Sequence, residues 1–174
     1  AREIGALPSA QVLLSSHSPS ILSRIEPEEV RYFRMDRSAR CSSIRELTLP
    51  EDDVEASVYV RLAVKAYPEL YFARFVILGE GDSERVVIPK IAEEMGVSLD
   101  PSFVPVVPLG GRFVAHFWRL LNDLEIPHAT LLDLDLGRRH GGANAMRSCL
   151  QNLAAIGSNF GSTNGANAAQ LTDQ

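Results

Sequence analysis

The second half of the chain alternates apolar, strand-like runs with amphipathic helical segments, and this alternation constrains the fold more than any other feature. The run Phe75–Leu78 precedes a helical segment at 83–96, and two further units follow at 103–126 and 128–157. Strand–helix repeats place their strands in parallel, because each helix returns the chain to the start of the next strand. The sequence therefore predicts an α/β fold with a parallel sheet flanked by helices.

The first half of the chain predicts a smaller and different part. Gln11–Ser16 is a short apolar run typical of a buried strand, and Ser18 with Pro19 predicts the start of a helix. Val30–Met35 and Ser43–Leu49 predict two more strands that form a hairpin-like pair. An acidic stretch around 51–55 marks the boundary, although a solvated linker face is the simpler explanation of such a stretch. A helix over 54–67 connects the two parts.

Composition narrows the class of protein. The 174 residues carry a net charge of −5, so there is no global basic field, and any nucleic-acid contact needs a local patch. Cys41 and Cys149 lie too far apart in sequence for a metal-binding spacing, which favours a reducing, cytoplasmic location. No apolar run approaches the roughly 20 residues that cross a bilayer. The chain begins without Met and is expected to be a fragment.

Acidic residues gather where the first strand of the α/β part meets its helix. Glu80, Asp82 and Glu84 follow Gly79 at a spacing of two. A helix N-terminus tolerates acidic side chains, so part of this pattern has a structural explanation. For Asp82, helix capping and metal binding explain its position equally well.

A second acidic pair stands in the third unit. In a strand, residues i and i+2 point to the same face, so Asp133 and Asp135 would project together. Two carboxylates on an apolar strand are costly to desolvate, and a cation removes that cost. The alternative is that these aspartates are solvated or cap the next helix.

The two acidic clusters predict one metal site if their strands are neighbours. Ligands of open α/β sheets gather at the carboxyl ends of strands, where Glu80, Asp133 and Asp135 stand. Oxygen ligands suit Mg²⁺ or Mn²⁺ rather than zinc. Glu84, one helical turn from Glu80, is placed to serve a second ion, and paired ions clamp the attacking and leaving oxygens of a phosphodiester.

These residues resemble the motifs of a known domain. Glu80 to Glu84 (EGDSE) after a strand, with Asp133-Leu134-Asp135 two units later, looks like the Toprim domain over about residues 75–156. The resemblance implies metal-dependent phosphodiester chemistry carried by Glu80, Asp133 and Asp135. It also implies Glu84 as a metal ligand and Asp82 as a secondary one.

The N-terminal part resembles a different domain. QVLLSSHSPSIL is similar to the late strand and switch-histidine loop of ABC-type ATPases, where His17 would match the histidine that senses the ATP γ-phosphate. A strand-end histidine beside a capping Ser18 is the alternative. An ATPase tail followed by a Toprim domain resembles the OLD (overcoming lysogenization defect) family of nucleases. This resemblance implies a DNA substrate, two divalent ions, coupling to an ATPase and a homo-oligomeric full-length protein.

The resemblance also divides the chain. Its implied parts are a C-terminal piece of an ABC-type ATPase domain at 1–52, a connecting helix and linker at 53–73, the Toprim domain at 74–157, and a loop or tail at 158–174. No Gly-rich phosphate-binding loop is present, so ATP is expected to bind only through an ATPase domain upstream of this chain. OLD-family nucleases also use a downstream lysine, whereas Lys65 and Lys90, the two lysines here, precede Asp133.

Three arginines are candidates for DNA contact. Arg138 and Arg139 stand just past the acidic pair, and Arg112 begins the preceding helix. Arginine suits phosphate contacts, although solvated surface positions explain these residues about as well. Two other functions stay open on the sequence: another Toprim enzyme such as a primase-like nucleotidyl transferase, or a non-catalytic metal-binding or assembly module of an ATPase.

Overall fold

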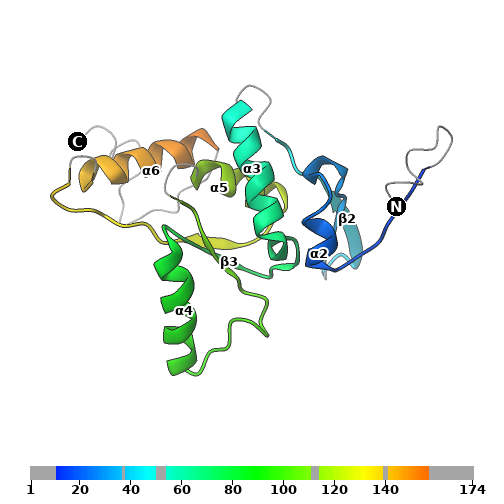
Figure 1. The fold of residues 1–174 in the computed structure, drawn as a ribbon, viewed down its shortest axis with the longest axis horizontal. Helices are drawn as coiled ribbons and strands as arrows, with labels where there is room; N and C mark the ends of the chain where they lie inside the picture. Colours follow the sequence, from blue (N-terminus) through cyan, green and yellow to red (C-terminus); the bar gives the residue numbers. More distant parts are fainter. Residues whose placement is uncertain (1–10, 37, 50–53, 111–113, 139–140, 157–174) are drawn as a thin grey trace.

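The computed structural model describes residues 11–36, 38–49, 54–110, 114–138 and 141–156 (Figure 1). The fold is mixed α/β. In chain order its helices and strands are α2 (Pro19–Leu22), η1 (Pro27–Glu29), β1 (Tyr32–Asp36), β2 (Cys41–Arg45), α3 (Val54–Ala66), η2 (Pro68–Phe72), β3 (Val76–Gly79), α4 (Asp82–Glu94), β4 (Val106–Pro108), α5 (Val114–Asp123), β5 (His128–Thr130) and α6 (Ala143–Ala155).

A parallel three-stranded sheet organises the larger part, as the strand–helix alternation predicts. Its strand order is β4-β3-β5, with β3 at the centre. Ile77 of β3 lies opposite Val106 on one side and Ala129 on the other. The prolines of the predicted second strand suit its position at an edge, since Pro has no N–H to donate to an outer neighbour.

Helices cover the sheet on two sides. Figure 1 shows α4 on one side of β3, with α3 and α5 on the other. The chain therefore leaves β3 toward one face and enters β5 from the opposite face. In open α/β sheets this reversal creates a switch point between the first and third strands, here β3 and β5, and ligands bind at its carboxyl end.

The hydrophobic core lies between the sheet and α5. Leu78 of β3 and Phe117, Trp118 and Leu121 of α5 are buried in one cluster. The indole N–H of Trp118 donates a 2.7 Å hydrogen bond to the hydroxyl of Thr130, which ties α5 to β5. By contrast, α4 contributes no buried residue, so its position depends on contacts at its half-buried face.

An antiparallel hairpin forms the centre of the N-terminal part. β1 pairs with β2 from Tyr32 opposite Arg45 to Asp36 opposite Cys41. Asp36 closes the turn, because its Oδ1 accepts from the hydroxyl and the N–H of Ser38 and from the next N–H along the chain. These bonds, the Ser38 hydroxyl first, lower the pKa of Asp36.

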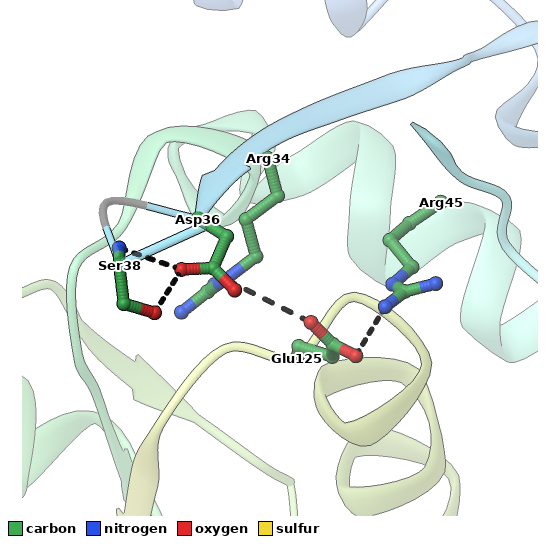
Figure 2. Close-up of polar contacts among 5 residues, drawn as sticks. All are labelled: Arg34, Asp36, Ser38, Arg45 and Glu125. Carbon is green, nitrogen blue, oxygen red and sulfur yellow. Dashed lines mark hydrogen bonds and ion pairs between the residues drawn. The ribbon is translucent and has the colours of Figure 1, made fainter. Parts of the chain in front are cut away.

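Ion pairs join this hairpin to the larger part. Figure 2 shows Glu125, which follows α5, facing Arg34 and Arg45 of the two hairpin strands. The Arg34 Nε to Glu125 Oε2 distance is 3.9 Å, and Arg45 makes the closer contact through Nη2. All three side chains are a third or more exposed, so this contact orients the hairpin more than it stabilises the fold.

The structure differs from the sequence-based prediction at the first strand. Residues 11–16 have no strand pairing within the described part of the chain, and the Leu13 side chain is 88% exposed. A β-strand needs a neighbour to satisfy its N–H and C=O groups, and an apolar run alone does not supply one. The predicted helix start is confirmed, because Ser18 is the N-cap of α2 with Pro19 as its first residue. The short 3₁₀ turns η1 and η2 were not predicted.

Two further observations concern the class of protein. Cys41 and Cys149 are both free thiols. Among the helices that the structure describes, none combines the length and the apolar character that crossing a bilayer requires.

Burial in the core predicts a large difference between two leucines. Leu121 is 0% exposed, whereas Leu62 on α3 is 62% exposed. We expect Leu121→Ala to lower the free energy of unfolding by about 2–5 kcal/mol, since it leaves a cavity between α5 and the sheet. Leu62→Ala, the matched control, should change it by less than about 0.5 kcal/mol. Urea denaturation followed by circular dichroism measures both, and equal losses would contradict the described core.

Candidate metal centre

The two acidic clusters meet at the carboxyl edge of the sheet. Glu80 directly follows β3, and Asp133 lies three residues after β5, the strand that pairs with β3. The Glu80 carboxylate accepts a 2.7 Å hydrogen bond through Oε2 from the backbone N–H of Asp133. The sequence analysis predicted that the two acidic clusters meet if their strands are neighbours. The strands β3 and β5 are neighbours, so this condition is met.

Backbone hydrogen bonds continue past the strand ends and fix the main chain around Glu80. Leu131 N–H donates to the Leu78 carbonyl at 2.8 Å on the β5 side. On the β4 side, Leu109 N–H donates to Gly79 at 2.8 Å, and Gly110 N–H donates to the Glu80 carbonyl at 3.1 Å. Glu80 is thus held between both neighbouring chain segments.

Glu84 folds back onto the start of its own helix. Its Oε2 accepts from the N–H of Gly81, the N-cap of α4, at 2.8 Å, and its Oε1 accepts from the Ser83 hydroxyl at 3.0 Å. The Gly81 N–H, followed by the backbone N–H of Glu84 itself and the Ser83 hydroxyl, lowers the pKa of Glu84. The carboxylate therefore stays ionised, as a metal ligand must.

Gly79 permits this arrangement of Glu84. A Cβ added at Gly79 would stand 2.5 Å from the Glu84 Cβ, which no side chain tolerates. The sequence analysis did not identify this role, although an isolated glycine at the end of an apolar strand is a known signal of close approach. Asp82 is the exposed first residue of α4, where its charge suits the helix N-terminus; Gly81, not Asp82, is the N-cap.

The prediction that Asp133 and Asp135 share one strand face is wrong. β5 ends at Thr130, and Asp135 has a φ of +46°, in the left-handed region that no regular strand contains. The leucines between and beside the aspartates are exposed, so no packing holds this segment in a sheet. Both aspartates lie in a loop after β5.

A compact turn places Asp135. Gly142 N–H donates to the Leu134 carbonyl at 2.6 Å, and Gly141 N–H donates to the Arg138 carbonyl at 3.1 Å. A Cβ at Gly141 would overlap the Asp135 carbonyl oxygen at 1.9 Å. Glycine at position 141 is therefore required for the turn, a role that the sequence analysis did not identify.

The remaining predicted residues are distributed as follows. Arg138 lies beside the acidic edge, with its Nε 3.3 Å from Asp135 Oδ1. Arg112 and Arg139 lie outside the described residues. His17 is exposed just before α2, and Figure 1 places α2 and α6 on opposite sides of α3, so His17 belongs to the N-terminal part and not to this edge.

The residues at this edge fit a hard divalent cation by chemistry, although they are not arranged around one. Among the described residues, no three His, Cys, Asp or Glu side chains are close enough together to hold a metal ion. Instead each carboxylate has a local partner: Glu80 the Asp133 N–H, Glu84 the Gly81 N–H, and Asp135 the Arg138 guanidinium. The donors are all oxygen atoms, which Mg²⁺ and Mn²⁺ prefer.

The glycine at position 141 gives a direct test of the Asp135 turn. We expect Gly141→Ala to break the turn, because its Cβ overlaps the Asp135 carbonyl, and the Gly142 N–H should lose protection from hydrogen exchange. Leu136→Ala, which trims an exposed side chain in the same loop, is the control. Amide exchange measured by NMR reads out both variants, and an unchanged Gly142 rate in Gly141→Ala would contradict the described turn.

Part of this edge lies within residues that match a known domain family. Residues 71–135 match the family model described as overcoming lysogenization defect protein-like, TOPRIM domain, a range that includes Glu80, Glu84 and Asp135. Endonuclease GajA of Bacillus cereus (strain VD045) is 31% identical over 130 residues, which cover 74% of this chain. They cover 22% of GajA, so the chain spans about a fifth of that relative's length.

Two of the solved structures that resemble this chain are C-terminal regions of bacterial OLD proteins. The C-terminal region of the Xanthomonas campestris pv. campestris OLD protein is 33% identical, with a TM-score of 0.45, and the match covers 59% of this chain and 46% of that one. The C-terminal region of the Burkholderia pseudomallei OLD protein is 30% identical, with a TM-score of 0.46, over 57% of this chain and 50% of that one.

Proposed function

We propose, from the premise that residues 71–135 form an OLD-like TOPRIM domain, that this chain belongs to a nuclease that cleaves or nicks DNA with divalent metal ions. One observation carries the proposal: Glu80 and Asp133 meet at the carboxyl edge of neighbouring parallel strands, where α/β folds bind ligands. The similarity to an endonuclease supports the same reaction class.

The acidic residues would hold the metal ions. In this proposal Glu80, Asp133 and Asp135 bind one ion, and Glu84 binds a second, with Asp82 as a secondary ligand. Two Mg²⁺ or Mn²⁺ ions, when bound, supply activation of water and stabilisation of the leaving oxygen. The protein contributes the positions of the carboxylates, which backbone N–H groups of Gly81 and Asp133 orient.

Arginines beside the acidic edge would hold the DNA backbone. The side chain of Arg138 is largely exposed next to Asp135, so it can reach a phosphate while its charge offsets the acidic cluster. We propose Arg112 and Arg139, at positions outside the described residues, for the same role.

The wider organisation of the protein is also a proposal. Residues 1–52 would be a piece of an ABC-type ATPase domain with His17 as its switch histidine, 53–73 the connection, 74–157 the TOPRIM domain, and 158–174 a loop or tail. ATP would bind in an ATPase domain outside this chain, and the full-length protein would be a cytoplasmic homo-oligomer. The family match of residues 71–135 supports the position of the TOPRIM domain in this division.

Removing the charge of Glu80 tests the metal site. We expect Mn²⁺ to raise the melting temperature of the chain and to support plasmid nicking, with EDTA abolishing both effects. Glu80→Gln keeps an oxygen that accepts from the Asp133 N–H but loses the charge, so it should weaken metal binding and nicking by about 10–100-fold. Glu93→Gln, on the exposed face of α4 and paired with Lys90, is the control.

The results of this experiment separate the candidate functions. An unchanged melting temperature with Mn²⁺, together with no nicking, would overturn the proposed metal site. Stabilisation by Mn²⁺ that depends on Glu80, without nicking, would favour a non-catalytic metal-binding module. Nicking with Mg²⁺ or Mn²⁺ that Ca²⁺ does not support would establish a nuclease.

A matched pair of arginines tests the DNA contact. Arg138 stands at the acidic edge, and Arg74 is exposed at the opposite end of β3. We expect Arg138→Ala to weaken binding of a short duplex about equally for all sequences and to reduce the slope of log K against log salt by about 1. Arg74→Ala should leave the slope unchanged. Fluorescence anisotropy at several salt concentrations measures the slope, and equal behaviour of the two variants would contradict the proposed contact.

A further inference from the structure

We propose that Tyr59 of the connecting helix α3 is a positioning residue that fixes the peptide between Leu109 and Gly110 against the main chain of Glu80. The contact itself is independent of the proposed function, whereas its consequence for metal binding and nicking rests on that function. Neither the family match nor the acidic motif includes Tyr59, which precedes the matched range.

The phenol of Tyr59 is fixed at both ends. Its hydroxyl donates a 2.6 Å hydrogen bond to the carbonyl of Leu109, a residue that is 1% exposed. Its ring meets the ring of Phe117 edge to face, with 6.0 Å between centroids and 81° between planes. Burial, and to a smaller extent Tyr67, raises the pKa of Tyr59, so its hydroxyl keeps the proton that it donates.

The acceptor of this bond belongs to a peptide that also contacts Glu80. The Leu109 carbonyl and the Gly110 N–H are the two polar groups of one peptide, and this N–H donates to the Glu80 carbonyl at 3.1 Å. Because a peptide is planar, a donor that fixes its carbonyl also fixes the direction of its N–H. The bond from Tyr59 further polarises the peptide, which strengthens the bond to Glu80.

The backbone conformation explains why this peptide needs a partner outside the sheet. The N–H groups of Leu109 and Gly110, consecutive in sequence, both donate to the β3 side, at Gly79 and Glu80. In a regular strand consecutive N–H groups point to opposite sides, so the chain turns here, and Gly110 has a φ of +64°. The Leu109 carbonyl therefore points away from β3, where α3 supplies the hydroxyl of Tyr59.

A pair of tyrosines isolates the effect of the hydroxyl. Tyr59→Phe removes only the hydroxyl and keeps the ring against Phe117. Tyr71→Phe is the matched control, because the buried Tyr71 hydroxyl has no hydrogen-bond partner among the described residues. Both variants keep an aromatic ring and are expected to fold, which near-ultraviolet circular dichroism verifies.

Hydrogen exchange without metal provides the first readout. We expect the Gly110 amide to exchange about fivefold faster in Tyr59→Phe than in the parent chain, the factor that one ordinary hydrogen bond contributes. The Gly110 rate in Tyr71→Phe should equal that of the parent. An unchanged Gly110 rate in Tyr59→Phe would overturn the proposal.

Metal titration provides the second readout. The Mn²⁺ concentration for half-maximal thermal stabilisation should rise about fivefold in Tyr59→Phe, with Glu80→Gln measured in parallel. If Glu80→Gln abolishes stabilisation and Tyr59→Phe leaves the Mn²⁺ requirement unchanged, the positioning role fails while the proposed function stands. If Glu80→Gln changes nothing, the proposed function fails, and faster Gly110 exchange still supports Tyr59 as the residue that fixes this turn.

Discussion

The pairing of β3 with a parallel neighbour on each side is the constraint on which the rest of the structure depends. Parallel pairing puts the carboxyl ends of all three strands at one edge, and the reversal of strand order at β3 leaves a crevice for a ligand between β3 and β5 at that edge. Glu80 then accepts hydrogen bonds from the backbone N–H groups of both Asp133 and Gly110. Residues more than fifty positions apart in sequence thus become one local structure.

Backbone N–H groups bind the carboxylates of Glu80 and Glu84 at this edge. Carboxylates repel each other, yet those of Glu80 and Glu84 accept hydrogen bonds from the main-chain N–H groups of Asp133 and Gly81. These N–H groups orient the two carboxylates, and the bond from Gly81 lowers the pKa of Glu84. Arg138 is different, because its positive charge offsets the negative charge of Asp135. If Asp135 binds a cation, or if Arg138 binds a phosphate, this ion pair has to weaken.

The sequence predicts the regular parts of this fold well, because their signals are local. The strand–helix alternation predicts the parallel sheet, and it places Glu80 and Asp133 after two of its strands; that these two strands are neighbours is known only from the structure. The geometry around Asp135 does not follow, because an apolar alternation forms a strand only when a neighbour covers it, and the leucines beside Asp135 are exposed. Residues 11–16, which were predicted as a strand, have no pairing partner among the described residues for the same reason.

Hydrogen bonds between residues far apart in the sequence cannot be predicted from its hydrophobic periodicity either. The helical pattern over 54–67 predicts α3 correctly, but any tyrosine on a half-buried helix face is most simply a core residue. Only the structure shows that the Tyr59 hydroxyl meets the carbonyl of Leu109. The requirement for glycine at position 79 is likewise known only from the structure, because it depends on the position of the Glu84 side chain.

The helix α3 contacts both the N-terminal part and the turn beside the acidic edge. On one side of the helix, Arg61 and Lys65 form ion pairs with Glu26 in the N-terminal part. On another, Tyr59 holds the turn beside Glu80, and beyond the end of the helix the ring of Tyr67 lies under Arg85, the residue that follows Glu84. The helix α3 therefore contacts the N-terminal part through charged side chains and the acidic edge through the hydroxyl of Tyr59, so a displacement of the helix would reach Gly110 and Glu80 through that hydrogen bond.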